Sequence, residues 1–155
     1  MEPRYFEDMQ IGEVWEHTGE PVTAESIIDF GRKYDPEPFH TDPEAARHSF
    51  FGELVASGAQ TFALWRLLNW HMVQRNGNII LGGAGSDEMR LHRPVRPGDV
   101  LRVHSELIEK IPSRSKPDRG IIRARETVYN QDDEVVMTLI GIAVAARRPA
   151  ADAGS

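Results

Sequence analysis

An α+β fold is predicted, in which an antiparallel sheet wraps around one long buried helix. The middle of the sequence holds a long apolar segment, and the second half holds several runs that alternate between apolar and polar residues. A helix that is apolar on most sides needs burial, and a half-buried sheet offers it a matching apolar face. The 155 residues contain no repeat and no linker, so we expect one domain over residues 1–146 and a flexible tail over 147–155.

The first half is predicted to form helices and loops. Thr23 is suited to cap a helix over residues 24–34, and Asp42-Pro43 is typical of the start of a short helix. Ser57-Gly58-Ala59-Gln60 has the form of a capping box, and the apolar segment Thr61–Trp70 follows it. We therefore expect the central helix to begin directly after Ser57 and to be buried on most sides.

The second half is predicted to form strands, because its apolar residues recur with a period of about two. Pro97-Gly98 is a turn signal ahead of the longest alternating run. Gly82, Gly83 and Gly85 are expected to distort a strand, since no helix pattern follows them. Together with a short strand in the first half, the expected strands cover residues 14–17, 79–89, 101–111, 121–129 and 135–144.

Composition and charge argue against several classes of protein. The formal net charge is −6, and the one dense basic stretch, Arg114–Arg119, also contains Asp118, so we expect no nucleic-acid partner. No apolar stretch approaches the roughly 18 residues that a membrane span needs. The sequence has no cysteine, and its histidines show no metal-binding spacing, so we expect neither disulfides nor a metal site. These features are compatible with the cytoplasm, which is the expected location.

The chemically most informative stretch runs from Asp35 to His40. Pro36 and Pro38 lie between these two residues and disfavour a continuous helix, so we expect a stiff loop. Stiffness suits an acid/base pair, because the pair must hold its geometry through each turnover. A plainer interpretation is that Asp35 caps a helix or turn and that His40 lies on the surface.

Three motifs carry a resemblance to a known family. Asp35-Pro36-Glu37-Pro38-Phe39-His40 resembles the signature of MaoC-like dehydratases and (R)-specific enoyl-CoA hydratases, which has Asp, any residue, Asn, Pro, an apolar residue and His. Leu54–Gly58 resembles the family's apolar-small-Gly segment, which opens the central helix. His92–Asp99 resembles its Arg-Pro-Val-x-x-Gly-Asp element, apart from His92 at an apolar position. The resemblance covers about residues 6–146 and implies the hotdog fold.

The resemblance also implies a reaction, the reversible hydration of a trans-2-enoyl thioester of CoA or acyl carrier protein to the (3R)-hydroxyacyl thioester. It implies that Asp35 accepts a proton from water and that His40 orients this water and shares the proton transfer to C2. The backbone N–H of Gly58 would stabilise the negative charge that develops on the thioester oxygen. No cofactor is expected beyond the thioester substrate. A plainer role for Gly58 is helix packing or capping.

Three positions depart from the family pattern. Glu37 replaces the Asn of the signature, and Ser57 replaces a His that often precedes the helix glycine. Arg66 occupies the position of a helical Ser that supports the site in relatives. Because arginine is rarely buried without a partner, we expect Arg66 either to pair with Glu37 or another subunit's carboxylate, or to reach the surface.

Two readings of function from other classes remain open, because one fold hosts several activities. A hotdog thioesterase would need a carboxylate that faces the thioester carbon, and the central helix offers no Asp or Glu between Ala56 and Val73. A non-catalytic acyl-CoA-binding module would not need the pair of Asp35 and His40. We also expect a homodimer, because a sheet wrapped around one helix leaves an edge strand unpaired.

Overall fold

The computed structural model describes residues 1–150 and contains one curved sheet with a long helix across it. The observed elements confirm the α+β class and follow the expected order along the chain. They are η1 (Phe6–Asp8), β1 (Val14–Pro21), α1 (Ala24–Tyr34), α2 (Pro38–Thr41), α3 (Pro43–Arg47), α4 (Gly58–Asn76), β2 (Ile80–Leu91), β3 (Val100–Pro112), β4 (Arg119–Tyr129) and β5 (Val135–Ala146).

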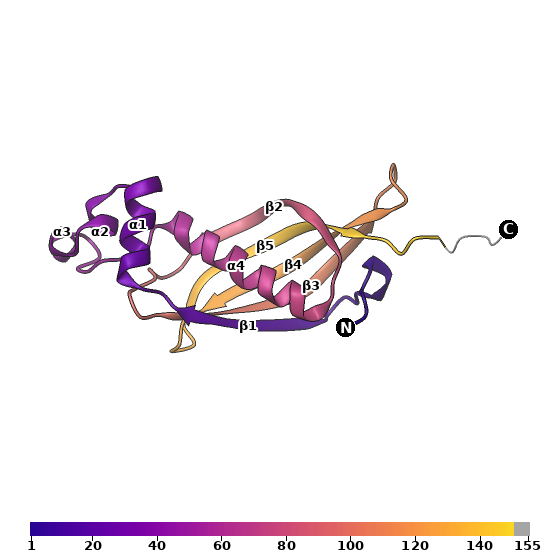
Figure 1. The fold of residues 1–155 in the computed structure, drawn as a ribbon, viewed down its shortest axis with the longest axis horizontal. Helices are drawn as coiled ribbons and strands as arrows, with labels where there is room; N and C mark the ends of the chain where they lie inside the picture. The colour runs from indigo at the N-terminus through magenta and orange to yellow at the C-terminus, as the bar shows by residue number, and fades with distance from the viewer. Residues whose placement is uncertain (151–155) are drawn as a thin grey trace.

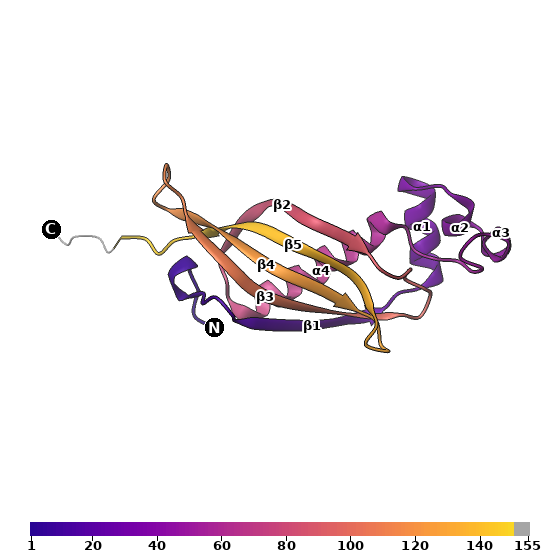
Figure 2. The same cartoon turned by 180° about the vertical axis from the view of Figure 1, so that it is seen from behind.

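The five strands form one antiparallel sheet with the order β1-β3-β4-β5-β2. The helix α4 crosses one face of this sheet, and the three short helices gather beyond one end of it (Figure 1). Figure 2 shows the opposite face, on which the strands are not covered by a helix. The sheet therefore wraps around α4, as expected for a hotdog fold.

The strand β2 lies at an edge of the sheet and is irregular. Its pairing with β5 shifts register between Ile80 and Gly82, between Gly83 and Gly85, and again near its end. The first two shifts confirm that the glycines distort this strand. Nearly all residues of β2 are exposed. The edge of β2 that faces away from β5 has no partner strand in this sheet and is available for pairing.

The helix α4 is longer and less buried than the sequence suggests. It continues six residues beyond Trp70 and ends at Gly77, whose φ of 72° suits the left-handed position after a helix. Trp65, Leu68 and Met72 are buried against the sheet. Two large apolar side chains of α4 stay exposed in the single chain, Leu67 at 53% and Trp70 at 51%. The expectation of burial on most sides is therefore wrong for the single chain.

The segment between α1 and α4 differs from the expected stiff loop. Pro38 occupies the first position of a one-turn helix, α2, where its missing N–H costs nothing. Ser57 does cap α4, but its hydroxyl accepts from the N–H of Ala59. The side chain of Gln60 donates to the carbonyl of Ser26 and does not complete a capping box.

The beginning of the expected tail is held to the domain. Arg147 forms a 2.8 Å ion pair with Glu7, and Arg148 forms a 2.6 Å ion pair with Asp8. The Arg147 guanidinium, together with the backbone N–H of Arg148, lowers the pKa of Glu7 to about 2. The remaining residues of the expected tail, 151–155, lie outside the described residues. Within residues 1–150, no helix is long and apolar enough to cross a membrane.

Candidate active site

Asp35 is placed by the end of helix α1. Its backbone N–H donates to the carbonyl of Gly31 at 2.9 Å, so Asp35 is the C-terminal cap residue of that helix. Its side chain is 36% exposed and points toward His40. The capping interpretation of Asp35 is correct for its backbone, and it leaves the carboxylate free for other partners.

His40 lies on α2 and is buried, so the interpretation of His40 as a surface residue is wrong. Its Nδ1 lies 2.6 Å from the carbonyl oxygen of Val55, and its side chain is 7% exposed. A carbonyl oxygen only accepts hydrogen bonds, so Nδ1 carries the proton and the tautomer is set. Its Nε2 then faces the Oδ2 of Asp35 at 3.4 Å.

The approach of α1 to α2 depends on Gly31. A Cβ at this position would lie 2.7 Å from the carbonyl oxygen of His40 and 3.0 Å from its Cβ. Any side chain larger than hydrogen would push α2 away from α1. Gly31 therefore lets the helix that ends in Asp35 pack closely against the turn that carries His40.

Ser57 joins the pair to the central helix. Its hydroxyl donates to the Oδ2 of Asp35 at 2.7 Å and accepts from the N–H of Ala59 at 3.2 Å. The side chain of Ser57 thus caps α4 and fixes the Asp35 carboxylate at the same time. Ser57 itself is 1% exposed.

Gly58 is the first residue of α4, beside Ser57. The described part of the chain offers the Gly58 N–H no hydrogen-bond acceptor, as is usual in the first turn of a helix. A Cβ at Gly58 would lie 2.6 Å from the Cδ1 of Leu91 on β2. The free N–H, together with the positive end of the helix dipole, can stabilise negative charge on an oxygen placed next to it.

The motif His92–Asp99 supports the segment that precedes α4. The carbonyl of Val95 accepts from the N–H of Ala56 at 2.8 Å, and the carbonyl of Phe39 accepts from the N–H of Val55 at 3.1 Å. Gly98 has a φ of 89°, which confirms the turn expected at Pro97-Gly98. Val95, a buried residue of this motif, therefore helps to hold the segment before α4 on which His40 and Ser57 depend.

Two of the candidate residues lie apart from the pair. Glu37 is exposed at the start of α2, and its side chain makes no capping hydrogen bond. Arg66 lies two turns along α4 from Gly58 and donates to the Oδ1 of Asn69 at 3.3 Å. The expected pairing of Arg66 with Glu37 is not made. The single chain leaves Arg66 exposed, which agrees with the alternative that its side chain reaches the surface.

The sequence reasoning missed Glu126 on strand β4. Glu126 is 2% exposed and lies directly opposite Ser105 of β3, whose hydroxyl donates to its Oε1 at 3.0 Å. The signal was present, because Glu126 falls in phase with the buried residues Ile122 and Val128 of the same strand. A carboxylate on the buried phase of a strand is a candidate functional residue.

The arrangement can move a proton to or from a water molecule. The partly exposed Asp35 carboxylate and the buried His40 imidazole lie together near the start of α4, where the N–H of Gly58 is also free. Both groups are common general acids and bases. Within residues 1–150, no group of three or more His, Cys, Asp and Glu side chains is arranged to hold a metal ion.

Comparisons with known proteins identify the family of this chain. A family model described as "MaoC like domain" matches residues 8–130. The uncharacterized protein YdeM of Bacillus subtilis is 31% identical over 128 residues, covering 83% of this chain and 89% of its own. The 3-hydroxybutyryl-CoA dehydratase of Methylorubrum extorquens is 26% identical over 113 residues, covering 72% of this chain and 69% of its own.

A solved structure gives the same answer for the fold. The crystal structure of the MaoC-like dehydratase from Rhodospirillum rubrum matches with a TM-score of 0.83 and 38% identity, over 95% of this chain and 99% of that one. Residues 8–130, which the family model matches, include Asp35, His40, all of α4 and the whole of strands β1 to β4. The chain therefore belongs to the MaoC-like family of hydratase and dehydratase domains.

Proposed function

We propose that this protein catalyses the reversible hydration of a trans-2-enoyl thioester to the (3R)-3-hydroxyacyl thioester. The observation that carries the proposal is the geometry of His40, whose Nδ1 is held by Val55 while its Nε2 lies 3.4 Å from Asp35. Only Nε2 is then free to exchange a proton with substrate or water. The carrier of the acyl group is CoA or acyl carrier protein.

In the hydration direction, a water oxygen forms a bond to C3 and gives one proton to the Asp35 carboxylate. His40 orients the same water by accepting a hydrogen bond from it at the unprotonated Nε2. The proton on Asp35 then passes to Nε2 across the 3.4 Å gap and from Nε2 to C2 as the enolate collapses, which restores both groups. Water is consumed and added across the double bond, so the step uses no cofactor.

The Gly58 N–H is assigned to the thioester oxygen, where negative charge builds up as water attacks. A donor in this place acts mainly on the transition state, because the oxygen carries little charge in the bound substrate. Ser57 keeps Asp35 oriented, and its exposure of 1% keeps this hydrogen bond away from bulk solvent. A place in cytoplasmic fatty acid metabolism is part of the same proposal, because the substrate is an acyl thioester.

The experiment is a panel of trans-2-enoyl-CoA esters, with loss of the enoyl thioester absorbance as the readout. We expect hydration by the wild-type protein and a product of (3R) configuration, checked by chiral chromatography. Free thiol is measured in parallel, because its release without a hydroxyacyl product would identify a thioesterase and overturn the proposal. Tight binding of acyl-CoA without any turnover would identify a binding module instead.

A further inference from the structure

A cavity of about 600 Å³ lies between α4 and the inner face of the sheet. It begins at Phe62, one turn along α4 from Gly58, and extends past Trp70. The apolar residues that line it include Val73, Ile80 and Leu107. The cavity therefore starts where the acyl chain of a thioester held at Gly58 would enter.

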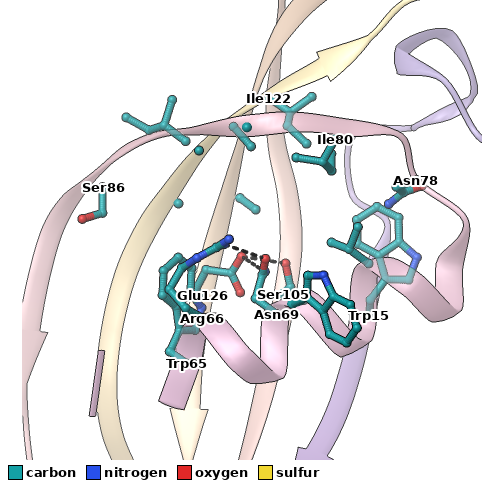
Figure 3. Close-up of a pocket in the computed structure, with 18 of the residues that line it drawn as sticks. Trp15, Trp65, Arg66, Asn69, Asn78, Ile80, Ser86, Ser105, Ile122 and Glu126 are labelled. Carbon is teal, nitrogen blue, oxygen red and sulfur yellow. Dashed lines mark hydrogen bonds between the residues drawn. The ribbon is translucent and has the colours of Figure 1, made fainter. Parts of the chain in front are cut away.

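Four polar side chains gather at one part of the cavity wall. Glu126 and Ser105 project from neighbouring strands, and Arg66 and Asn69 project toward them from α4 (Figure 3). Asn69 connects helix α4 with the sheet. Its Nδ2 donates to Glu126 of β4 and its Oδ1 accepts from Arg66 of α4, both at 3.3 Å. Of the described residues that line the cavity, only Arg66 and Glu126 carry an ionisable charge.

Glu126 is not fully satisfied by the protein. Its Oε1 accepts from both Ser105 and Asn69, whereas its Oε2 has no hydrogen-bond partner. The indole N–H of Trp65 lies near the carboxylate without completing a hydrogen bond. Burial raises the pKa of Glu126 to about 7, against the lowering effects of Ser105, Trp65 and Arg66. Burying a carboxyl group with an unpaired oxygen costs stability, so a group of this kind in a cavity is a candidate functional residue.

Arg66 also has unused capacity. Its guanidinium carries five N–H donors and donates one hydrogen bond, to Asn69. It lies 5.5 Å from the ring centre of Trp65 and forms no ion pair with a carboxylate of residues 1–150. Arg66 is exposed, so water can satisfy these donors in the free protein. A plain alkyl chain that lies against Arg66 would offer the donors no acceptor, whereas an oxygen-bearing group would accept hydrogen bonds from them.

We propose that this cavity binds an acyl chain whose far end carries an oxygen-bearing polar group, a carboxylate or a hydroxyl, with Arg66 as its main donor. The proposal rests on the hydratase function proposed above and names its substrate class. Arg66 lies eight positions after Gly58, which places it about 12 Å farther along the helix axis. Arg66 is thus a specificity-determining residue, remote from the atoms that react.

Binding of saturated acyl-CoA esters tests this substrate class without requiring any turnover. Three ligands of equal chain length are compared by calorimetry: one with a methyl end, one with a terminal hydroxyl and one with a terminal carboxylate. We expect at least one polar-ended ligand to bind about tenfold more tightly than the methyl-ended ligand. Tighter or equal binding of the methyl-ended ligand would overturn the proposal.

The variant Arg66→Met keeps the length of the stem and removes the donors. It should bind the methyl-ended ligand at least as well as the wild type does and should lose the preference for polar ends. Arg114→Met, in the exposed loop after β3, is the matched control and should keep the wild-type preference. A preference that survives Arg66→Met would overturn the role of Arg66.

The same ligands as trans-2-enoyl esters separate this proposal from the proposed reaction. Hydration that favours polar-ended esters supports both. Hydration confined to methyl-ended esters overturns the substrate class and leaves the reaction standing. Selective binding of polar-ended ligands without hydration of any ester supports the substrate class of the cavity and overturns the reaction.

Discussion

The hydroxyl of Ser57 donates a 2.7 Å hydrogen bond to the Oδ2 of Asp35, although the two residues are 22 positions apart in the sequence. The same oxygen of Asp35 faces the Nε2 of His40. The cap of α4 and the end of α1 thereby meet at one carboxylate. Because this contact is buried on the serine side, a change in either helix is transmitted directly to the proposed base.

Asp35→Asn and His40→Ala should each lower kcat by roughly 10²–10⁴, the usual contribution of a general acid or base. The double variant should lose far less than the product of the two effects, because the residues act on one water. Steady-state kinetics and thermal melts on the three proteins check this. Hydration at the wild-type rate by Asp35→Asn would falsify the assignment.

Ser57→Ala should cost about 1 kcal/mol of folding stability, because it removes the cap of α4. It should also lower kcat about tenfold, because Asp35 loses the group that orients it. Thr23→Ala is the matched control, since Thr23 caps α1 in the same way and does not contact Asp35. Denaturant melts should show similar losses for both, and kinetics should separate them. Equal activity of the two variants would contradict the positioning role.

Gly58→Ala should reduce kcat/KM by roughly tenfold or more while the melting temperature changes little. The added methyl group obstructs the approach of the thioester to the N–H, and Leu91, at 51% exposure, has room to move away from it. The same change is repeated in a Leu91→Ala background to isolate the obstruction. If activity returns there, displacement of Leu91 caused the loss and the role of the N–H is not supported.

The pKa of Glu126, about 7 in the folded protein, makes stability depend on pH. The unfolded chain releases this proton near its ordinary value of 4.5, so between about 4.5 and 7 the folded state holds more protons. The contribution of Glu126 to the free energy of unfolding is therefore fully present below pH 4.5 and is lost as the pH rises through about 7. The loss is on the order of 3 kcal/mol.

Glu126→Gln cannot ionise, so its free energy of unfolding should lack this fall. The difference between variant and wild type should grow in favour of the variant as the pH rises from 4.5 to 8, in urea melts at each pH. Glu20→Gln, at an exposed position, is the control and should track the wild type. A constant difference across the pH range would show that Glu126 is ionised throughout.

The protein should be a symmetric homodimer in solution at micromolar concentration. The strand β2 presents a free edge, and exposed apolar side chains lie on it and on α4, including Leu81 and Leu67 at 53% exposure each. Light scattering gives the mass. Leu81→Asp should shift the protein toward the monomer, and Ile111→Asp, exposed on β3, should not. A monomeric wild type would refute the prediction.

The sequence by itself determined the order of elements and the chemistry of the motifs. Thr23 and Ser57 mark helix starts by hydrogen bonds to nearby backbone, and Pro97-Gly98 marks a turn, because these are local effects. The resemblance of the stretch Asp35–His40 to the family signature identified the candidate pair. The expected ranges include all five strands, although each strand extends beyond the expected range at one end at least.

Only the tertiary structure decided which groups meet. The bond from His40 to Val55 spans 15 positions, and Asn69 reaches Glu126 across 57 positions. Register places Ser105 opposite Glu126, and no local pattern specifies a register between two strands. The exposure of Leu67 and Trp70 on α4 is also a tertiary property. An apolar side chain does not specify whether its own sheet or another chain covers it.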